Sequence, residues 1–311
     1  MVSVHKSVLL HETIESLISA PSNVSKEFPW YVDGTLGGAG HTLAIAVALR
    51  GKINIIGIDQ DPEAIHRAEE TLKGRAEKLI LECENFRNID KILAKHKIDK
   101  VDMILLDLGI SSDELQNSGR GFSFQKDEPL LMTMGDSAES CKADPVEYPF
   151  TARDILNDWK EDDIANVIFA YGEEGYARRI ARAVVNYRLK KKIESTSELA
   201  EIVRQAVPPA YRHRKINPAT KTFQALRIAV NDELKALEEG LNKSYEHLNK
   251  NGRLGVIAFH SLEDRIVKNF MRREEANGAK LIPRRAVKPT DTEITENPRA
   301  RSAKLRVIEK Q

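Results

Sequence analysis

Several features of secreted, membrane-bound and metal-binding proteins are missing from this sequence of 311 residues. Its apolar runs are all shorter than the roughly 20 residues that a membrane-spanning helix needs. Its first residues lack the basic start and the apolar stretch of a signal peptide. Only two cysteines are present, Cys83 and Cys141, without the spacing of metal ligands. We therefore expect a cytoplasmic protein with reduced thiols, no metal and no membrane contact.

An excess of charge of one sign is also missing. The 48 basic and 47 acidic residues give a formal net charge of +1, so the total charge neither indicates nor excludes a nucleic-acid partner. Hydrophobic residues make up 41% of the chain, which is typical of a folded protein rather than a disordered one. A chain of this length can bury a large core, and we expect two lobes.

What the sequence does contain is an alternation of short apolar runs and helical patterns over its first hundred residues. The runs predict buried strands of a parallel sheet, and the alternation is typical of a doubly wound α/β fold. The predicted strands lie at 30–34, 53–59, 78–83 and 101–109.

The alternation stops after the fourth predicted strand. From 112 to 216 only helical stretches occur, and the α/β pattern then returns with a long helix at 220–248. We therefore predict one α/β domain in two parts, 1–111 and 217–311, interrupted by a helical domain at 112–216. Two late strands belong to the second part, at 252–261 and 304–310.

A glycine-rich segment follows the first predicted strand and reads DGTLGGAGH from Asp33 to His41. An NAD-binding loop would read G-x-G-x-x-G without a preceding acid. Asp33 suits the ammonium group of an amino-acid ligand, and Asp59, at the end of the second strand, suits a ribose diol. The segment therefore predicts a site for S-adenosylmethionine. The alternative is that the glycines only form a tight turn and that Asp59 caps a helix.

Two further residues would complete this site. Phe86, after the third predicted strand, is placed to cover the adenine face, although a core aromatic at a strand–helix junction fits the pattern equally well. Asp107 ends the fourth apolar strand, near the reactive methyl group, where a carboxylate is costly to bury without a partner. Asp107 is our candidate for orienting the methyl acceptor or taking its proton.

The segment FHSLEDR at 259–265 contains a histidine, a serine and an acid. No G-x-S-x-G turn precedes Ser261, so we do not expect a hydrolase triad. Ser261 and Asp264 fit a helix cap better. His260 lies at the end of the predicted strand 252–261 and remains a candidate for the pocket of the target base.

The sequence resembles a known family at this point. Strings such as DGTLGGAGHT, LLDLGISS, TKTFQALRIAVNDEL, FHSLEDRIVKNFM and NPRARSAKLRV occur in the order and spacing of the bacterial small-subunit ribosomal RNA cytosine-N4 methyltransferases. The resemblance covers essentially the whole chain. It implies a class I S-adenosylmethionine-dependent methyltransferase fold with an inserted helical substrate-recognition domain. It also implies methyl transfer to the exocyclic N4 amine of a decoding-region cytosine in 16S ribosomal RNA.

Carried over position by position, the resemblance implies a set of cofactor contacts in this chain. The family's next contact after the fourth strand is a glutamine, and Glu114 stands there. The family also has an acid and an arginine where this chain has Leu131 and Thr133. Together with the glycine loop, the predicted cofactor residues are Asp33, Gly37, Gly38, Ala39, Gly40, His41, Asp59, Phe86, Asp107 and Glu114; the predicted catalytic residues are Asp107 and His260.

The implied partner is small-subunit ribosomal RNA or the assembled small subunit, with a monomer and a homodimer both open. Phosphate contacts require basic side chains, and basic clusters occur at 178–192, 212–215, 284–288 and 299–301. Each cluster can also be a solvated surface. Three alternative functions remain: a nicotinamide-dependent dehydrogenase, a methyltransferase of another nucleic acid or of a protein, and a non-catalytic RNA-binding protein of ribosome assembly.

Overall fold

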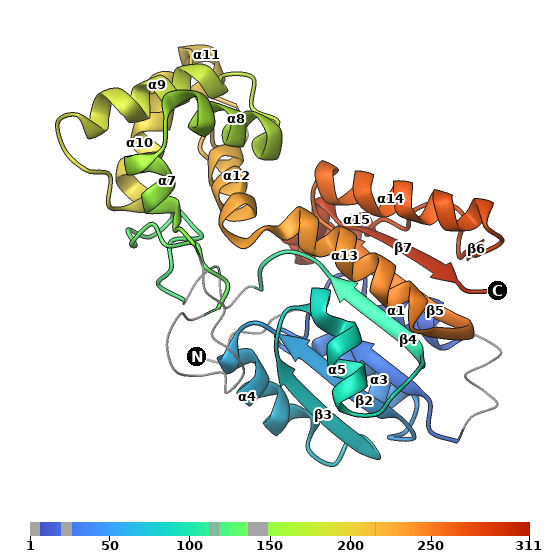
Figure 1. Cartoon of the computed structure of the whole chain (residues 1–311). Coiled ribbons are helices and arrows are strands. Elements are labelled where there is room, and N and C mark those ends of the chain that lie inside the picture. Colours follow the sequence, from blue (N-terminus) through green and yellow to red (C-terminus); the bar gives the residue numbers. More distant parts are fainter. Residues whose placement is uncertain (1–6, 20–26, 112–114, 116–117, 136–148, 215) are drawn as a thin grey trace. The chain divides into compact units, whose positions relative to one another are not determined.

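The computed structural model describes residues 7–19, 27–111, 115, 118–135, 149–214 and 216–311. These residues form two compact units (Figure 1). The sheet unit contains the described residues up to Ser111 and those from Leu234 onward, and the helical unit contains the described residues between them. The chain returns to the sheet unit at 234 rather than at 217, because helix α12 (Thr220–Asn231) packs mainly against α8 (Glu161–Gly172) of the helical unit.

The sheet unit is built on a seven-stranded sheet with the order β3-β2-β1-β4-β5-β7-β6. The first five of these strands are parallel neighbours, and β7 lies antiparallel to both β5 and β6. The doubly wound α/β sheet predicted from the sequence is confirmed. The strands are β1 (Trp30–Asp33), β2 (Asn54–Asp59), β3 (Lys78–Cys83), β4 (Val101–Asp107), β5 (Leu248–Ala258), β6 (Lys280–Leu281) and β7 (Lys304–Glu309).

Alternate residues of the central strands enter two hydrophobic cores, one on each face of the sheet. Tyr31 and Met103 belong to one core, whereas their chain neighbours Val32 and Ile104 belong to the other. Because both faces of the sheet are buried, both sets of alternating residues are apolar, and the strands therefore read as continuous apolar runs. The first core is covered by α1 (Leu10–Ile18) and α3 (Gly40–Ala48), and the second by α5 (Ile89–Lys95), α13 (Glu233–Glu246) and α14 (Ser261–Ala276). Helix α4 (Pro62–Leu72) packs on β2 and β3.

The helical unit contains short helices, most of which bury one apolar face. Close approach of α8 and α12 depends on Gly172, because a Cβ atom there would lie 2.6 Å from the carbonyl oxygen of Lys221. The remaining helices are α7 (Ala152–Asp158), α9 (Ala177–Arg188), α10 (Thr196–Ala206) and α11 (Pro209–Arg212).

The long helix predicted at 220–248 is two helices. Asp232 has a φ of 50°, in the left-handed region, and ends α12 one residue before α13 begins. Arg227 and Glu233 form an ion pair across this break, with Nε and Oε1 2.7 Å apart. The apolar periodicity continues through the break, so the sequence pattern alone indicates one helix.

Two expectations drawn from absent features can be compared with the structure. No helix in the described part of the chain is long and apolar enough to cross a membrane. The expectation of reduced thiols is wrong for Cys83, which is disulfide-bonded. Cys141 lies outside the described residues.

Candidate active site

Three predicted site residues lie at the carboxyl ends of neighbouring strands. Asp33 of β1 is paired with Gly57 of β2 and with Leu105 of β4. Asp59 and Asp107 therefore each lie two residues further toward the carboxyl edge, on either side of the loop that leaves β1. In open α/β sheets a ligand binds at this edge, in the crevice where the strand order reverses. The sheet thus places the glycine loop between two carboxylates.

The glycine loop is held against the end of β2. The backbone N–H of Gly37 donates to Oδ2 of Asp59 at 2.7 Å, and Gly37 itself has a φ of 47°. Ala39 is buried and also left-handed, with a φ of 57°, and α3 begins directly after it at Gly40. Gly38, between them, is exposed. The loop therefore offers exposed backbone beside a carboxylate whose position is fixed, which is an arrangement suited to a nucleoside ligand.

Asp59 is not the cap of the following helix. The residue that caps α4 is Asp61, whose carboxylate accepts from the backbone N–H of Glu63 at 3.2 Å. Asp59 instead accepts from Gly37 and, through Oδ1, from the N–H of Asp61 at 2.9 Å. Two N–H donors thus orient the carboxylate at the end of β2.

Asp33 is almost completely enclosed, with 2% of its surface exposed. Its Oδ2 accepts from the hydroxyls of Tyr31 at 3.2 Å and Thr42 at 2.5 Å, and its Oδ1 accepts from the N–H of Thr35. Burial raises the pKa of Asp33, and the hydroxyl of Thr42 is the largest opposing influence. The carboxylate therefore ties β1, the loop and α3 together.

Asp107 ends β4 with a different set of contacts. Its backbone N–H donates to Oγ1 of Thr35 at 2.6 Å, whereas its buried Oδ1 has no hydrogen-bond partner among the described residues. The side chain is 19% exposed. Desolvation by burial raises the pKa of Asp107 to about 6; the nearby His41 opposes this shift, and the charges of Asp33 and Glu263 add to it.

His41 lies between a carbonyl and Asp107. Its Nε2 is 2.9 Å from the carbonyl oxygen of Val8, and its Nδ1 is 3.4 Å from Oδ2 of Asp107. A carbonyl only accepts, so Nε2 carries a proton. At 3.4 Å the Nδ1 atom is an electrostatic neighbour of the Asp107 carboxylate.

Phe86 belongs to a short 3-10 helix, η1 (Phe86–Asn88), after β3. Its ring packs against α13 at Gly240, where a Cβ atom would lie 2.5 Å from the ring. It is one of the partly buried side chains that pack on the second hydrophobic core. The structure thus gives Phe86 a packing role, and adenine contact by its remaining surface stays a prediction.

His260 is the cap of α14. Its Nδ1 accepts from the backbone N–H of Glu263, whose carboxylate accepts in return from the N–H of His260 at 3.2 Å and of Phe259 at 2.8 Å. The expected cap of Ser261 and Asp264 is therefore wrong by one residue. Asp264 instead pairs with Arg306 of β7 at 2.8 Å. The base-pocket role of His260 stays a prediction.

Three positions that set this chain apart from the family pattern lie outside these contacts. Glu114 falls outside the described residues. Leu131 and Thr133 are half-buried in a segment of the helical unit that Asn231 holds through the carbonyl of Met132 at 2.7 Å. Their side chains make no hydrogen bond or ion pair with the rest of the described chain.

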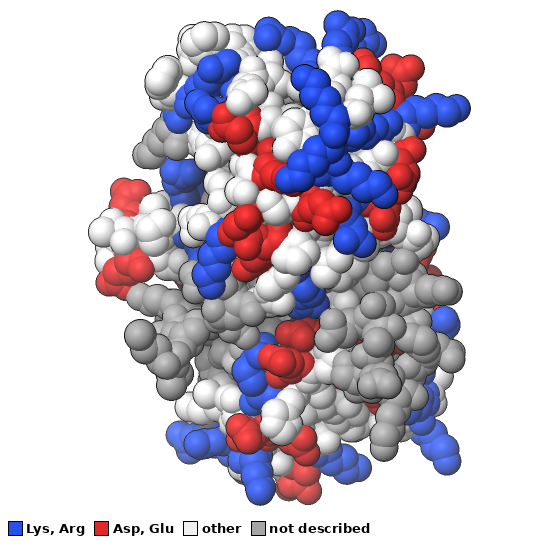
Figure 2. Space-filling view, turned by 90° about the vertical axis from the view of Figure 1, so that its left-hand side faces the viewer, with Lys and Arg blue, Asp and Glu red and all other residues white. Residues whose placement is uncertain are grey.

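Several of the predicted basic side chains are already paired. On α9, Arg182 lies 3.5 Å from Glu161, and Arg188 donates to the carbonyls of Leu156 and Trp159. Lys191 pairs with Glu198. Figure 2 shows the same mixture on one face of the molecule, where Lys and Arg are interleaved with Asp and Glu. A run of basic residues is thus a weak indicator of a nucleic-acid surface.

Several residues that contact Asp33 and Asp107 or shift the pKa of Asp107 were not predicted from the sequence. Thr35 and Thr42 contact Asp33, and Thr35 also positions Asp107. Glu263 is buried, caps α14 and raises the pKa of Asp107. The two threonines stand in or directly after the glycine loop, so their position was a usable signal. The approach of Glu263 to Asp107 depends on the pairing of β5 with β4, which carries no local signal.

Comparison with known proteins bears on this geometry. A family model described as the MraW methylase family matches residues 2–311. The chain is 44% identical over 308 residues to "Ribosomal RNA small subunit methyltransferase H" of Kosmotoga olearia, covering 98% of this chain and 97% of that protein. It is 43% identical over 328 residues to the protein of the same name from Heliobacterium modesticaldum, covering 100% and 99%.

A solved structure of an rRNA methylase from Streptococcus thermophilus matches 100% of this chain and 98% of its own, with 12% identity and a TM-score of 0.42. That likeness is too distant to bear on function. The family model and the two relatives indicate the same family, and the seven-stranded sheet has the fold expected for it. The chain belongs to the MraW methylase family, with the fold of a class I methyltransferase and S-adenosylmethionine as its cofactor.

Proposed function

We propose that this chain transfers the methyl group of S-adenosylmethionine to the N4 amine of a cytosine in 16S ribosomal RNA. The names of the relatives support a small-subunit ribosomal RNA substrate. The observation that carries the chemistry is Asp107, a buried carboxylate with an oxygen that lacks a partner among the described residues, at the strand edge where the ligand binds. Such an oxygen can accept a hydrogen bond from an exocyclic amine.

The glycine loop and Asp59 are the residues that would hold the cofactor. Asp59 would accept hydrogen bonds from the ribose hydroxyls, and the exposed backbone at Gly38 would leave room for the nucleoside to approach. When bound, the cofactor supplies an electrophilic methyl group on a positively charged sulfur. Asp33 acts indirectly, because its oxygens are engaged by Tyr31, Thr35 and Thr42.

The acceptor amine needs orientation and a place for its proton. The lone pair of a cytosine amine is delocalised into the ring, so alignment in a dry pocket matters more than a covalent nucleophile. Oδ1 of Asp107 accepts one N–H of the amine, and the ionised carboxylate takes the proton as the new N–C bond forms. His41, whose Nδ1 lies 3.4 Å from Oδ2, lowers the pKa of Asp107 and so favours the ionised carboxylate.

The helical unit is proposed as the part that recognises the RNA. Arg178 and Arg179 are exposed on α9, and Arg179 lies 5.9 Å from the centre of the Tyr176 ring. Cationic and aromatic side chains of this kind bind phosphates and unstacked bases. A ribosomal RNA substrate also places the enzyme in the cytoplasm.

The test is incubation of the purified chain with labelled S-adenosylmethionine and either unmodified small subunits or naked 16S transcript. We expect label in N4-methylcytosine at one position of the decoding region, identified by nuclease digestion and mass spectrometry. Label on another base, or on DNA or protein, would contradict the proposed acceptor. A folded chain that binds the cofactor but transfers no label to either RNA would favour the non-catalytic alternative.

A further inference from the structure

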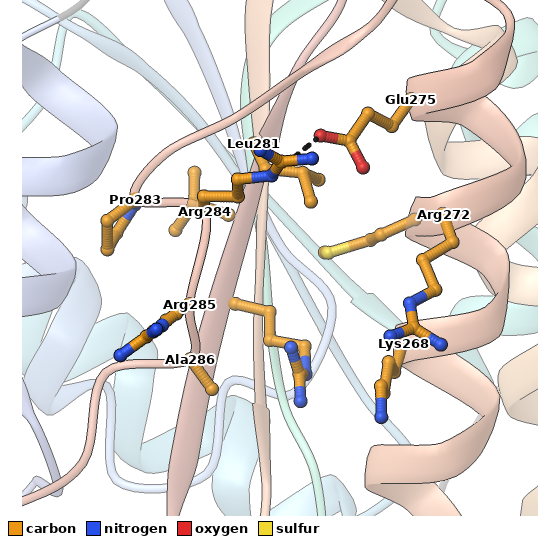
Figure 3. Close-up of a pocket in the computed structure, with 11 residues that line it drawn as sticks. Lys268, Arg272, Glu275, Leu281, Pro283, Arg284, Arg285 and Ala286 are labelled. Carbon is orange, nitrogen blue, oxygen red and sulfur yellow. Dashed lines mark ion pairs between the residues drawn. The ribbon is translucent and has the colours of Figure 1, made fainter.

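The sheet unit contains a second concave site, a pocket of about 330 Å³ that none of the predicted site residues lines. It lies between α14, the segment 281–286 and β7. Figure 3 shows Lys268 and Arg272 on the helix at one side and Arg284 and Arg285 on the segment opposite. Cationic side chains therefore approach the same space from two separate parts of the chain.

The charge of this pocket is only partly compensated. Its lining includes one acid, Glu275, which lies 3.6 Å from Nε of Arg284. Three cations remain without an ion-pair partner within the part of the chain that the structure describes. They are Lys268, Arg272 and Arg285. Uncompensated cations around one cavity repel one another, and an anion in the cavity relieves that repulsion.

Apolar side chains form the rest of the lining. Leu281 and Ala286 are half-buried and Pro283 is exposed, so these three offer apolar surface to a ligand, whereas Met271 and Val307 are only 2% and 1% exposed. An inorganic anion would leave this apolar surface without a contact. A ligand that uses both parts has a flat, weakly polar body and a negative group, and the volume falls at the lower end of the range of small-molecule sites. A nucleotide has both properties, since bases stack on apolar and guanidinium surfaces.

We propose that this pocket binds one unpaired nucleotide of the RNA substrate, away from the methyl-transfer site. Lys268, Arg272 and Arg285 contact its phosphate, and the base lies against Leu281 and Pro283. The inference rests on the proposed function in that it takes RNA to be the substrate. Contacts to phosphate fix the register of a nucleic acid without reading its sequence. The pocket thus anchors the RNA at a second point and positions the target base.

The test is binding of the full-length protein to a 16S ribosomal RNA transcript over a range of salt concentrations. The double variant Lys268→Ala/Arg272→Ala removes one lysine and one arginine of the pocket. The matched control, Lys73→Ala/Arg75→Ala, removes one of each at exposed positions next to β3, the opposite edge strand of the sheet. Each lost phosphate contact lowers the slope of log affinity against log salt by about 0.7–0.9.

We expect the pocket variant to lose about 1.4–1.8 of the slope and to bind roughly tenfold more weakly near 0.1 M salt. The control should keep the slope of the unmodified protein, and both variants should keep its affinity for S-adenosylmethionine. Ultraviolet cross-linking followed by mass spectrometry should place a nucleotide on the peptides that contain Met271 or 281–286. Equal slopes for the two variants, or cross-links that avoid these peptides, would overturn the inference.

Three further outcomes separate this inference from the proposed function and from the binding of a free nucleotide. If cytidine monophosphate protects the pocket peptides but the RNA slopes are equal, the pocket is a site for a free nucleotide and the inference fails. If the slopes differ as expected while the protein does not form N4-methylcytosine, the proposed function fails and the pocket remains an RNA site. If methylation occurs and the slopes are equal, only the pocket is excluded.

Discussion

Asp33 and Asp107 end neighbouring strands of one sheet, and the structure treats their carboxylates in opposite ways. Asp33 accepts three hydrogen bonds from its own strand, loop and helix, whereas Oδ1 of Asp107 has no partner among the described residues. Burial raises the pKa of both. A buried acid with every oxygen engaged holds a scaffold together, and one with an open oxygen is available to a ligand. Position at a strand end does not separate the two roles.

The comparison is sharpest when both acids receive the same isosteric change, and the largest effect is expected for Asp107→Asn. The amide cannot accept the amine proton, so we expect kcat for methyl transfer to fall by about 10² or more. The free energy of unfolding should stay the same or rise, because a buried charge without a full set of partners is removed. Single-turnover methylation and denaturant unfolding measure the two quantities.

Cofactor affinity provides the control for Asp107→Asn. Calorimetric titration with S-adenosylmethionine should show a site that still binds, which separates a lost chemical step from a lost ligand. Full turnover with unchanged cofactor affinity would exclude Asp107 from the reaction. In that case Oδ1 of Asp107 would have no role in the methyl transfer.

Asp33→Asn should have a smaller effect, and on stability rather than on chemistry. An amide nitrogen in place of Oδ2 accepts from neither Tyr31 nor Thr42, so hydrogen bonds to a buried acceptor are lost, although removal of a buried charge offsets part of the cost. We expect the free energy of unfolding to fall by about 1–2 kcal/mol, while turnover of the folded fraction stays within about threefold.

Thr42→Val is the matched control for Asp33→Asn, because it removes one donor to the same carboxylate and keeps its charge. We expect a loss of about 1 kcal/mol in unfolding free energy. If folded Asp33→Asn loses methyl transfer as strongly as Asp107→Asn, the proposed difference in role between the two acids is wrong. Asp33 would then act on the cofactor, as its position before the glycine loop first suggested.

The parts of this site that sequence predicts are those set by local pattern. Apolar runs located the four strands that lead to the site, and their strand-end acids follow from those runs. The role of Asp33 was not predictable, because it depends on the hydroxyl of Thr42 nine residues away, on a helix that starts from a left-handed Ala39. The cap of α14 was misplaced by one residue because a histidine rarely takes this position.

The second pocket could be predicted from the sequence only in part. The basic residues at 284–288 were visible as a run, but Lys268 and Arg272 lie a helix turn apart on α14 and belong to no run. Only the packing of α14 beside β6 and β7 brings them together. The longer basic run on α9 reads more strongly, yet several of its cations are paired with carboxylates or carbonyls.

The pH dependence of activity, with an expected change of about tenfold, also separates the two acids. With a pKa of about 6, Asp107 is mostly protonated at pH 5 and mostly ionised at pH 7. We therefore expect kcat/KM for S-adenosylmethionine to rise about tenfold between these values and then level off. The rise should survive in Asp33→Asn and disappear from the residual activity of Asp107→Asn.

Stability should change with pH in the reverse direction. Because burial raises the folded-state pKa values of Asp33 and Asp107, the folded protein binds more protons than the unfolded chain, and for Asp107 it does so between about pH 4 and 6. The contribution of these groups to the free energy of unfolding is therefore largest at low pH and falls as the pH rises through this window. Each Asn variant should flatten the fall measured by denaturant unfolding, and only Asp107→Asn should flatten the activity profile as well. If the activity profile flattened in Asp33→Asn instead, the carboxylate that takes the proton would be Asp33 of β1 and not Asp107 of β4.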